Sequence, residues 1–226
     1  MKNFFLSIVI LLISASTVKS HVDHYSDFNY LEYELFRNNK SIGYHKYIFE
    51  RNLNNLSVRS EVSFKITKLG VDIYNYFAES EEIFKDSKFL KFSSKTNQNK
   101  KNKYVNISLK EDKDLLIDGS SFKGTTSKDA IVGTWWNHEI FKAKAQISAI
   151  SGRIIEQKVI FVGKEKIKLD NKVYDALHFN FLSSDETLPD KKRLNTHIWY
   201  DEKTFLWIKA SFNKQGLWEY RLKVSK

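Results

Sequence analysis

The chain has 226 residues, a formal net charge of +10, 42% hydrophobic residues and no Cys. This composition excludes a disulfide-held mini-protein and a disordered acidic chain, and its length suits one domain or two small ones. Aromatic residues reach 15%, whereas only 1 Pro and 8 Gly are present. Turns must therefore depend on Asn, Asp, Ser and Lys, and the aromatic content favours strands.

The first twenty residues, "MKNFFLSIVILLISASTVKS", are typical of an export signal. Lys2 supplies the positive start, and an apolar run of ten residues follows at 4–13. That run is too short to span a bilayer, and Val18 and Ser20 suit a cleavage site before His21. We expect residues 1–20 to be removed after Ser20, 21–29 to form a flexible terminus, and 30–226 to form one domain that does not span a membrane.

The positive charge is spread over most of the chain. Removal of residues 1–20, which hold Lys2 and Lys19 and no acid, leaves +8. Two local basic clusters, "KTNQNKKNK" at 95–103 and "DKKR" at 190–193, are interpreted as solvated turns. Neither alternates with aromatic residues in the manner of a nucleic-acid surface, so we expect no nucleic-acid partner. Attraction to an anionic polymer of the cell envelope stays open.

Alternation of apolar and polar residues predicts one strand after another. The clearest case is 56–64, where Leu56, Val58, Val62 and Phe64 share one face. The predicted strands cover 30–36, 42–49, 56–64, 71–84, 89–96, 105–109, 115–117, 154–162, 173–182, 196–200, 205–212 and 217–224. Short polar turns separate most of them, so consecutive strands should pair as an antiparallel meander.

The segment between residues 118 and 150 breaks this pattern. It carries loop signals and then "GTWWNHEIFKAKA", in which Asn137 is a suitable helix cap and Glu139 suits the start of a helix. We expect a short helix or plug near 136–146. The whole chain is then all-β, with about 11–12 strands curled into a barrel or half-barrel, because a flat sheet would expose its edges and one apolar face.

The order of several motifs resembles a family of uncharacterised exported proteins from Gram-negative bacteria. The motifs are "YELFRNNKSIGYHKYIF", "GTWWNHEIF", "ISAISGRIIEQKV", "IWYDEKTFLWIKASF" and "WEYRL". Asn39-Lys40 replaces the family's Asn-Gly turn, and His138 replaces its usual Pro. The family has domain-of-unknown-function status and is distantly similar to other exported barrel and half-barrel families. The resemblance implies a periplasmic β-barrel-like protein, with no established reaction or catalytic residue.

The candidate ligand-binding residues are Trp135, Trp136, Asn137 and His138. Flat rings beside an amide could line the mouth of a binding site. The same residues could instead plug one end of the barrel, with Asn137 capping the next turn, and this architectural interpretation is the one we favour.

No motif in the chain indicates catalysis, a metal or a cofactor. There is no G-x-S-x-G elbow, and "HEIFK" lacks the second His of a zinc helix. The first hypothesis is therefore a non-enzymatic protein that binds an apolar or amphipathic ligand such as a lipid, which requires an open cavity. The second is a scaffold that binds a protein or an anionic polymer, which requires a filled interior. The third, a hydrolase or metal enzyme, requires His45, His178 or His197 to meet carboxylates such as Asp175 or Asp201.

Overall fold

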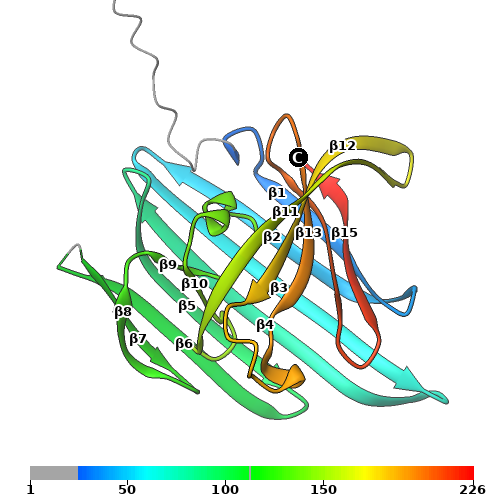
Figure 1. Cartoon of the computed structure of the whole chain (residues 1–226), viewed down its shortest axis with the longest axis horizontal. Helices are drawn as coiled ribbons and strands as arrows, with labels where there is room; N and C mark the ends of the chain where they lie inside the picture. Colours follow the sequence, from blue (N-terminus) through cyan, green and yellow to red (C-terminus); the bar gives the residue numbers. More distant parts are fainter. Residues whose placement is uncertain (1–24, 112) are drawn as a thin grey trace, which may run out of the picture.

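The computed structural model describes residues 25–111 and 113–226, and strands dominate that part of the chain (Figure 1). The strands are β1 Tyr30–Arg37, β2 Lys40–Asn52, β3 Asn55–Lys68, β4 Val71–Lys85, β5 Lys88–Gln98, β6 Lys101–Lys110, β7 Asp114–Gly119, β8 Lys123–Ser127, β9 Ala130–Val132, β10 Ala145–Ile147, β11 Ile154–Leu169, β12 Lys172–Ser183, β13 Asn195–Asp201, β14 Trp207–Asn213 and β15 Leu217–Ser225. Two short 3₁₀ helices, η2 His138–Phe141 and η3 Asp190–Lys192, lie in the longer connections. Within the described ranges no helix is long and apolar enough to cross a bilayer.

The strands form a single sheet of fifteen, in the order β8-β7-β6-β5-β4-β3-β2-β1-β15-β14-β13-β12-β11-β10-β9. The first strand therefore lies in the middle of the sheet, where it pairs antiparallel with the last one. The two strands at the sheet's edges, β8 and β9, are consecutive in sequence, so one short connection leads from one edge of the sheet to the other. All pairs are antiparallel except β9 with β10, which pair in parallel.

The sheet curls until the strands at one of its edges pack face to face on strands near the other edge. The short strands β9 and β10 lie within the hollow of the large sheet (Figure 1) and pack on β5, β6 and β7. This contact buries Phe92, Ile107 and Ile117 against Val132 and Ile147. Apolar burial thus closes the barrel where ladder hydrogen bonds do not, and the result is a nearly closed all-β barrel.

The sequence predicts the fold class correctly and underestimates the number of strands. The three extra strands β8, β9 and β10 fall in 118–150, where we expected loops and a helix or plug. They were missed because they have three to five residues, too few to show alternation. The expected short helix is present as η2, with the Asn137 side chain accepting from the Glu139 backbone N–H as a cap.

The start of the described chain is part of the core and not a loose end. Tyr25 is 1% exposed and packs on Phe49 and Trp136, and its hydroxyl accepts from the backbone N–H of Trp207. Asn29 also donates its backbone N–H to the Lys226 carbonyl. Our expectation of a flexible terminus at 21–29 is therefore wrong for residues 25–29, because an aromatic ring there fills a space in the core. The predicted signal at 1–20 lies outside the described residues.

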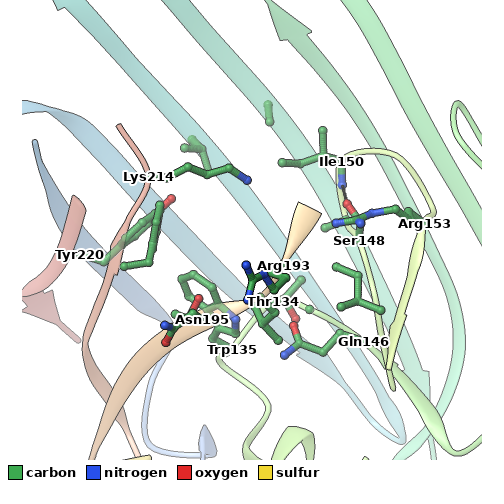
Figure 2. Close-up of a pocket in the computed structure, with 18 of the residues that line it drawn as sticks. Thr134, Trp135, Gln146, Ser148, Ile150, Arg153, Arg193, Asn195, Lys214 and Tyr220 are labelled. Atoms are coloured by element: carbon green, nitrogen blue, oxygen red, sulfur yellow. Dashed lines mark hydrogen bonds between the residues drawn. The ribbon is translucent and has the colours of Figure 1, made fainter. Parts of the chain in front are cut away.

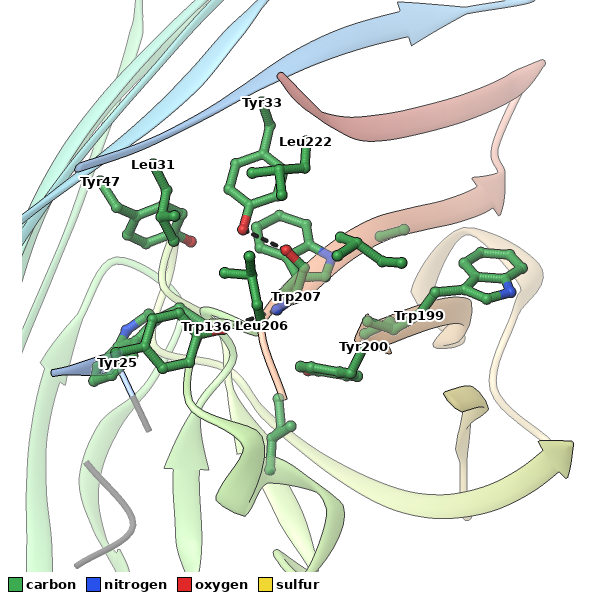
Figure 3. Packing of buried hydrophobic residues seen from close by; sticks show 14 of the residues in the cluster. Tyr25, Leu31, Tyr33, Tyr47, Trp136, Trp199, Tyr200, Leu206, Trp207 and Leu222 are labelled. Carbon is green, nitrogen blue, oxygen red and sulfur yellow. Dashed lines mark hydrogen bonds between the residues drawn. The ribbon is translucent and has the colours of Figure 1, made fainter. Parts of the chain in front are cut away.

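One end of the barrel is closed by aromatic side chains, and we call it the closed end. It comprises Tyr25, Trp136 and η2, together with the rings of Phe49 and Phe84. Figure 3 shows Tyr25 and Trp136 beside a larger buried cluster, in which the Tyr33 hydroxyl donates to the Trp207 carbonyl at 2.7 Å. The tyrosine hydroxyls thus satisfy their own hydrogen-bonding groups within the aromatic core by bonding to the backbone.

A buried carboxyl lies beside this aromatic cluster. Glu82 is 4% exposed and accepts from the indole N–H of Trp136 at 3.1 Å. Burial raises the pKa of Glu82 to about 7, and the side chains of Thr134 and Trp136 lower it only in part. Between the ordinary carboxyl pKa and pH 7 the folded state holds a proton that the unfolded state has lost, so stability falls as the pH rises through that range.

Replacement of this carboxyl should make the protein more stable at alkaline pH. Glu82→Gln keeps an acceptor for the indole and has no charge to bury. Urea unfolding at pH 8 should show a gain in the free energy of unfolding of up to roughly 3 kcal/mol, shrinking towards zero near pH 4.5. Glu81→Gln, on the next, partly exposed residue, is the matched control. An equal effect of Glu82→Gln at pH 5 and pH 8 would contradict the raised pKa.

Candidate functional site

The barrel interior contains a cavity of about 940 Å³ at the end opposite η2 (Figure 2). We call this the open end, and it is formed by the turns at 69–70, 99–100 and 214–216 and by the loop at 148–153. Strands on both sides of the barrel contribute to the cavity wall, from β2–β5 on one side to β12–β15 on the other. A volume of this size is in the range of sites that hold a small molecule.

The wall has an aromatic side and a hydroxyl side. Trp135 and Tyr220 meet edge to face, with ring centroids 5.6 Å apart. Across the cavity, Ser60, Ser80 and Ser94 lie directly beside one another on β3, β4 and β5, and the first two hydroxyl oxygens are 2.9 Å apart. One side thus offers flat rings to an apolar chain, whereas the other offers hydrogen-bonding groups.

Trp135 reaches the cavity through an uncommon backbone conformation. Its φ is 60°, in the left-handed region, and the Trp136 N–H donates to the Thr134 carbonyl at 2.8 Å to close a three-residue turn. Such a turn is strained for a bulky residue, and the surrounding structure must hold it. Two buried tyrosines do so: Tyr47 donates to the Thr134 carbonyl at 2.7 Å and Tyr200 to that of Trp135 at 2.8 Å.

The structure separates the four predicted site residues. Trp135 borders the cavity, whereas Trp136, Asn137 and His138 lie outside its wall. Trp136 is 1% exposed at the closed end, Asn137 caps η2, and His138 is buried beside Phe141 and Phe205. The segment therefore plugs one end of the barrel and presents a single ring to the cavity.

His45 is a wall residue whose part in this site the sequence did not reveal. Its ring packs against Tyr47 at 4.3 Å and Tyr220 at 5.9 Å, and neither ring nitrogen has a hydrogen-bond partner in the described structure. Burial lowers the pKa of His45 to about 3, so the ring is neutral at physiological pH. A neutral imidazole without partners has one donor and one acceptor to offer.

Two cations extend into the cavity near its mouth from opposite sides, Lys214 after β14 and Arg153 before β11 (Figure 2). Arg153 donates to the Lys192 carbonyl at 3.1 Å, and neither cation has a carboxylate partner among the residues that the structure describes. Burial, and secondarily the charge of Arg153, lowers the pKa of Lys214. Two further basic residues line the cavity: Arg193, which is paired with Asp190, and the exposed Lys158.

Acidic residues also border the cavity, and they limit how positive it is. Glu79 and Glu186 line its wall together with Asp190. No ion pair joins either glutamate to another described residue. Acidic and basic residues thus both border the cavity, and positive charge does not cover the whole wall.

His178 and His197 form a separate cluster on the outer face of the sheet. His178 lies 2.9 Å from the Glu165 carboxylate through Nδ1 and 2.8 Å from His197 through Nε2. Trp199 stacks on His178 and donates its indole N–H to the same carboxylate at 2.6 Å. His178 and His197, two of the three histidines considered for a catalytic or metal site, therefore lie together, and His45 lies apart from them. The carboxylate beside them is Glu165, not Asp175 or Asp201. Across residues 25–111 and 113–226 no three such groups are placed to hold a metal.

This arrangement defines a class of protein, a β-barrel-like protein with one plugged end and an internal cavity open at the other. The sequence profile described as "Domain of unknown function (DUF6134)" matches residues 33–223, and the chain belongs to that family. The comparison with curated proteins found no match.

A solved structure has a similar fold. It is the beta-barrel-like protein of domain of unknown function DUF1849 from Brucella abortus, with a TM-score of 0.60 over 87% of this chain and 96% of that one. The sequences are 11% identical, so this likeness concerns the fold alone. The expected relationship to a family of unknown function and to distant barrel proteins is confirmed.

The unpartnered imidazole in the wall should cost stability. We expect His45→Phe to raise the free energy of unfolding by about 1–2 kcal/mol at pH 7, since it removes two buried polar atoms without hydrogen bonds. The gain should grow as the pH falls from 6.5 towards 3, where the unfolded imidazole takes a proton and the folded one does not. Denaturant unfolding from pH 4 to pH 8, compared with His197→Phe on the outer face, tests this, and a destabilised variant would show that the ring nitrogens are satisfied.

Proposed function

We propose that this protein is exported to the periplasm and binds an amphipathic ligand in its barrel cavity, with the ligand's apolar part on the aromatic wall and its anionic end at the mouth. The observation that carries this proposal is a cavity of about 940 Å³ in which Lys214 and Arg153 have no carboxylate partner among the described residues. Export rests on the pattern of residues 1–20, with its short apolar run and small residues before His21.

The shape of the cavity favours binding over a filled scaffold. A scaffold that used only its outer surface would gain stability by filling the interior with side chains, because packing to native density is favourable. Here the plug fills the closed end alone and leaves the open end hollow. Trp135 is held at the inner limit of the cavity in a strained conformation, a cost that a ligand contact would explain.

The charges of the mouth favour an anionic end group. Burial is the main cause that lowers the pKa of Lys214, and the like charge of Arg153 lowers it further, so both effects disfavour the charged lysine in the cavity. A carboxylate or phosphate between the two cations would remove their repulsion and accept charge-assisted hydrogen bonds. The buried rings and the His45 imidazole would then face the rest of the ligand.

A pair of ligands that differ only in the end group tests this proposal. We expect dodecanoate to bind the protein from His21 onward at a ratio of one to one, and dodecanol to bind at least about tenfold more weakly because it lacks the charge. Isothermal titration calorimetry measures both. Lys214→Gln and Arg153→Gln should each weaken dodecanoate by about tenfold and leave dodecanol unchanged, whereas Lys203→Gln, at the closed end, should change neither.

Replacement of Trp135 tests how much the apolar wall of the cavity contributes to ligand binding. Trp135→Ala should weaken both ligands to the same degree, because it removes ring contact and no charge. Circular dichroism and thermal unfolding report whether the variant keeps its fold. If neither dodecanoate nor dodecanol binds the folded wild-type protein, the proposed function is wrong for ligands with such an alkyl chain, whatever the variants show.

A further inference from the structure

The hairpin between β3 and β4 ends in an apolar tip that nothing in the described chain covers. Leu69 is 95% exposed, Val71 64% and Ile73 51%. Leu69 also has φ of 51° in a two-residue turn, a position where Asn or Gly is favoured and leucine is unfavourable. Turns of the barrel such as 38–39 and 99–100 carry asparagine there. The tip thus combines exposed apolar area with an unsuitable turn residue, and packing within the fold explains neither.

Lysines flank this tip. The turn between β5 and β6 lies against β4, where the backbone N–H of Asn99 donates to the Asn75 carbonyl at 2.8 Å. This brings Lys100 and Lys101, both exposed, beside the hairpin of Leu69. Residues 65–77 and 95–103 together hold six lysines and one acid, Asp72. That acid is already paired with Lys65 at 3.3 Å, so the surface is strongly positive.

Both features belong to the open end. The turns at 69–70 and 99–100 are on the same side of the antiparallel sheet as the turn at 214–216, beside the cavity mouth (Figure 1). The cavity wall runs down to Tyr76 and Thr96, which lie a few residues from these turns. An object that contacts the tip therefore also faces the entrance of the cavity.

We propose that the β3–β4 tip, formed by Leu69, Val71 and Ile73, inserts into the surface of an anionic phospholipid bilayer while Lys68, Lys100 and Lys101 contact its headgroups. Apolar side chains gain free energy in the boundary between headgroups and acyl chains, and each nearby lysine adds attraction to anionic lipid. A protein partner would need an apolar groove of its own, whereas a bilayer accepts a narrow protruding tip without one. The surface is distinct from the cavity, so this inference stands apart from the ligand proposal.

The closed end of the barrel contains a matched control for both the apolar and the basic component of the tip. Leu53 has the same left-handed conformation, with φ of 50°, and is 99% exposed in the β2–β3 turn. It stands without the neighbouring Val and Ile of the tip. Lys85 and Lys88 likewise flank the β4–β5 turn at that end, and both are exposed. If docking is specific to the open end, changes at these positions should have no effect.

Insertion can be observed directly because the protein has no Cys. The protein from His21 onward, which contains all fifteen strands, is labelled with the fluorophore NBD at Leu69→Cys or at Leu53→Cys. With vesicles of phosphatidylcholine and phosphatidylglycerol in a 70:30 ratio, NBD at position 69 should shift to shorter wavelength and brighten, as it enters an apolar environment. NBD at position 53 should not change. A change at both positions, or at neither, would overturn the proposal.

Vesicle co-sedimentation measures the contribution of charge and of apolar insertion. Lys100→Gln combined with Lys101→Gln should weaken binding to the 70:30 vesicles by roughly 25-fold, about fivefold for each lysine. Leu69→Asn should weaken it by roughly tenfold. The paired changes at Lys85 and Lys88, and Leu53→Asn, should alter it by less than about twofold, and vesicles of phosphatidylcholine alone should bind little. Equal losses of vesicle binding from changes at the two ends of the barrel would show non-specific attraction and contradict the proposal. If the wild-type protein does not sediment with the 70:30 vesicles, the proposal is wrong, whereas the proposed binding of dodecanoate is unaffected.

Discussion

The attachment of residues 134–136 to the barrel wall is the constraint on which the rest of this structure depends. Three buried groups hold that short segment: the hydroxyls of Tyr47 and Tyr200 and the carboxyl of Glu82. Each bond satisfies a polar atom that would otherwise be buried alone, so all three strongly favour one position of the segment. They hold Trp135 in its left-handed conformation and direct the adjacent rings to opposite ends of the barrel.

This attachment makes the two ends of the barrel unlike each other. At the closed end, Trp136 packs against Tyr25, Phe49 and Phe84, and all four rings are buried. At the open end the interior stays hollow, and it is bordered by aromatic rings, serine hydroxyls, acidic residues and cations. The exposed tip of β3 and β4 lies at that same end. Ligand entry and surface docking, as we propose them, would thus share one end of the molecule, and stability would come chiefly from the other.

The candidate site could be predicted from the sequence only in part. The pair of tryptophans stood out because it interrupts an alternating pattern, and one of the two does border the cavity. Lys214 and Arg153 gave no such signal, since each belongs to an ordinary polar turn and about sixty residues separate them. His45 appeared only as one member of a hypothetical histidine group, because no local pattern shows whether a ring nitrogen will find a partner.

The sequence by itself determined the all-β class, the antiparallel pairing of most neighbours and the cap at Asn137, because alternation and turn chemistry act over a few residues. Only the tertiary structure decided that β1 pairs with β15, that β9 and β10 fold inward onto β5–β7, and that Tyr25 completes the core. These contacts join residues far apart in the chain. They depend on how completely apolar surface is buried when the sheet curls, a property of the whole barrel that no short segment encodes.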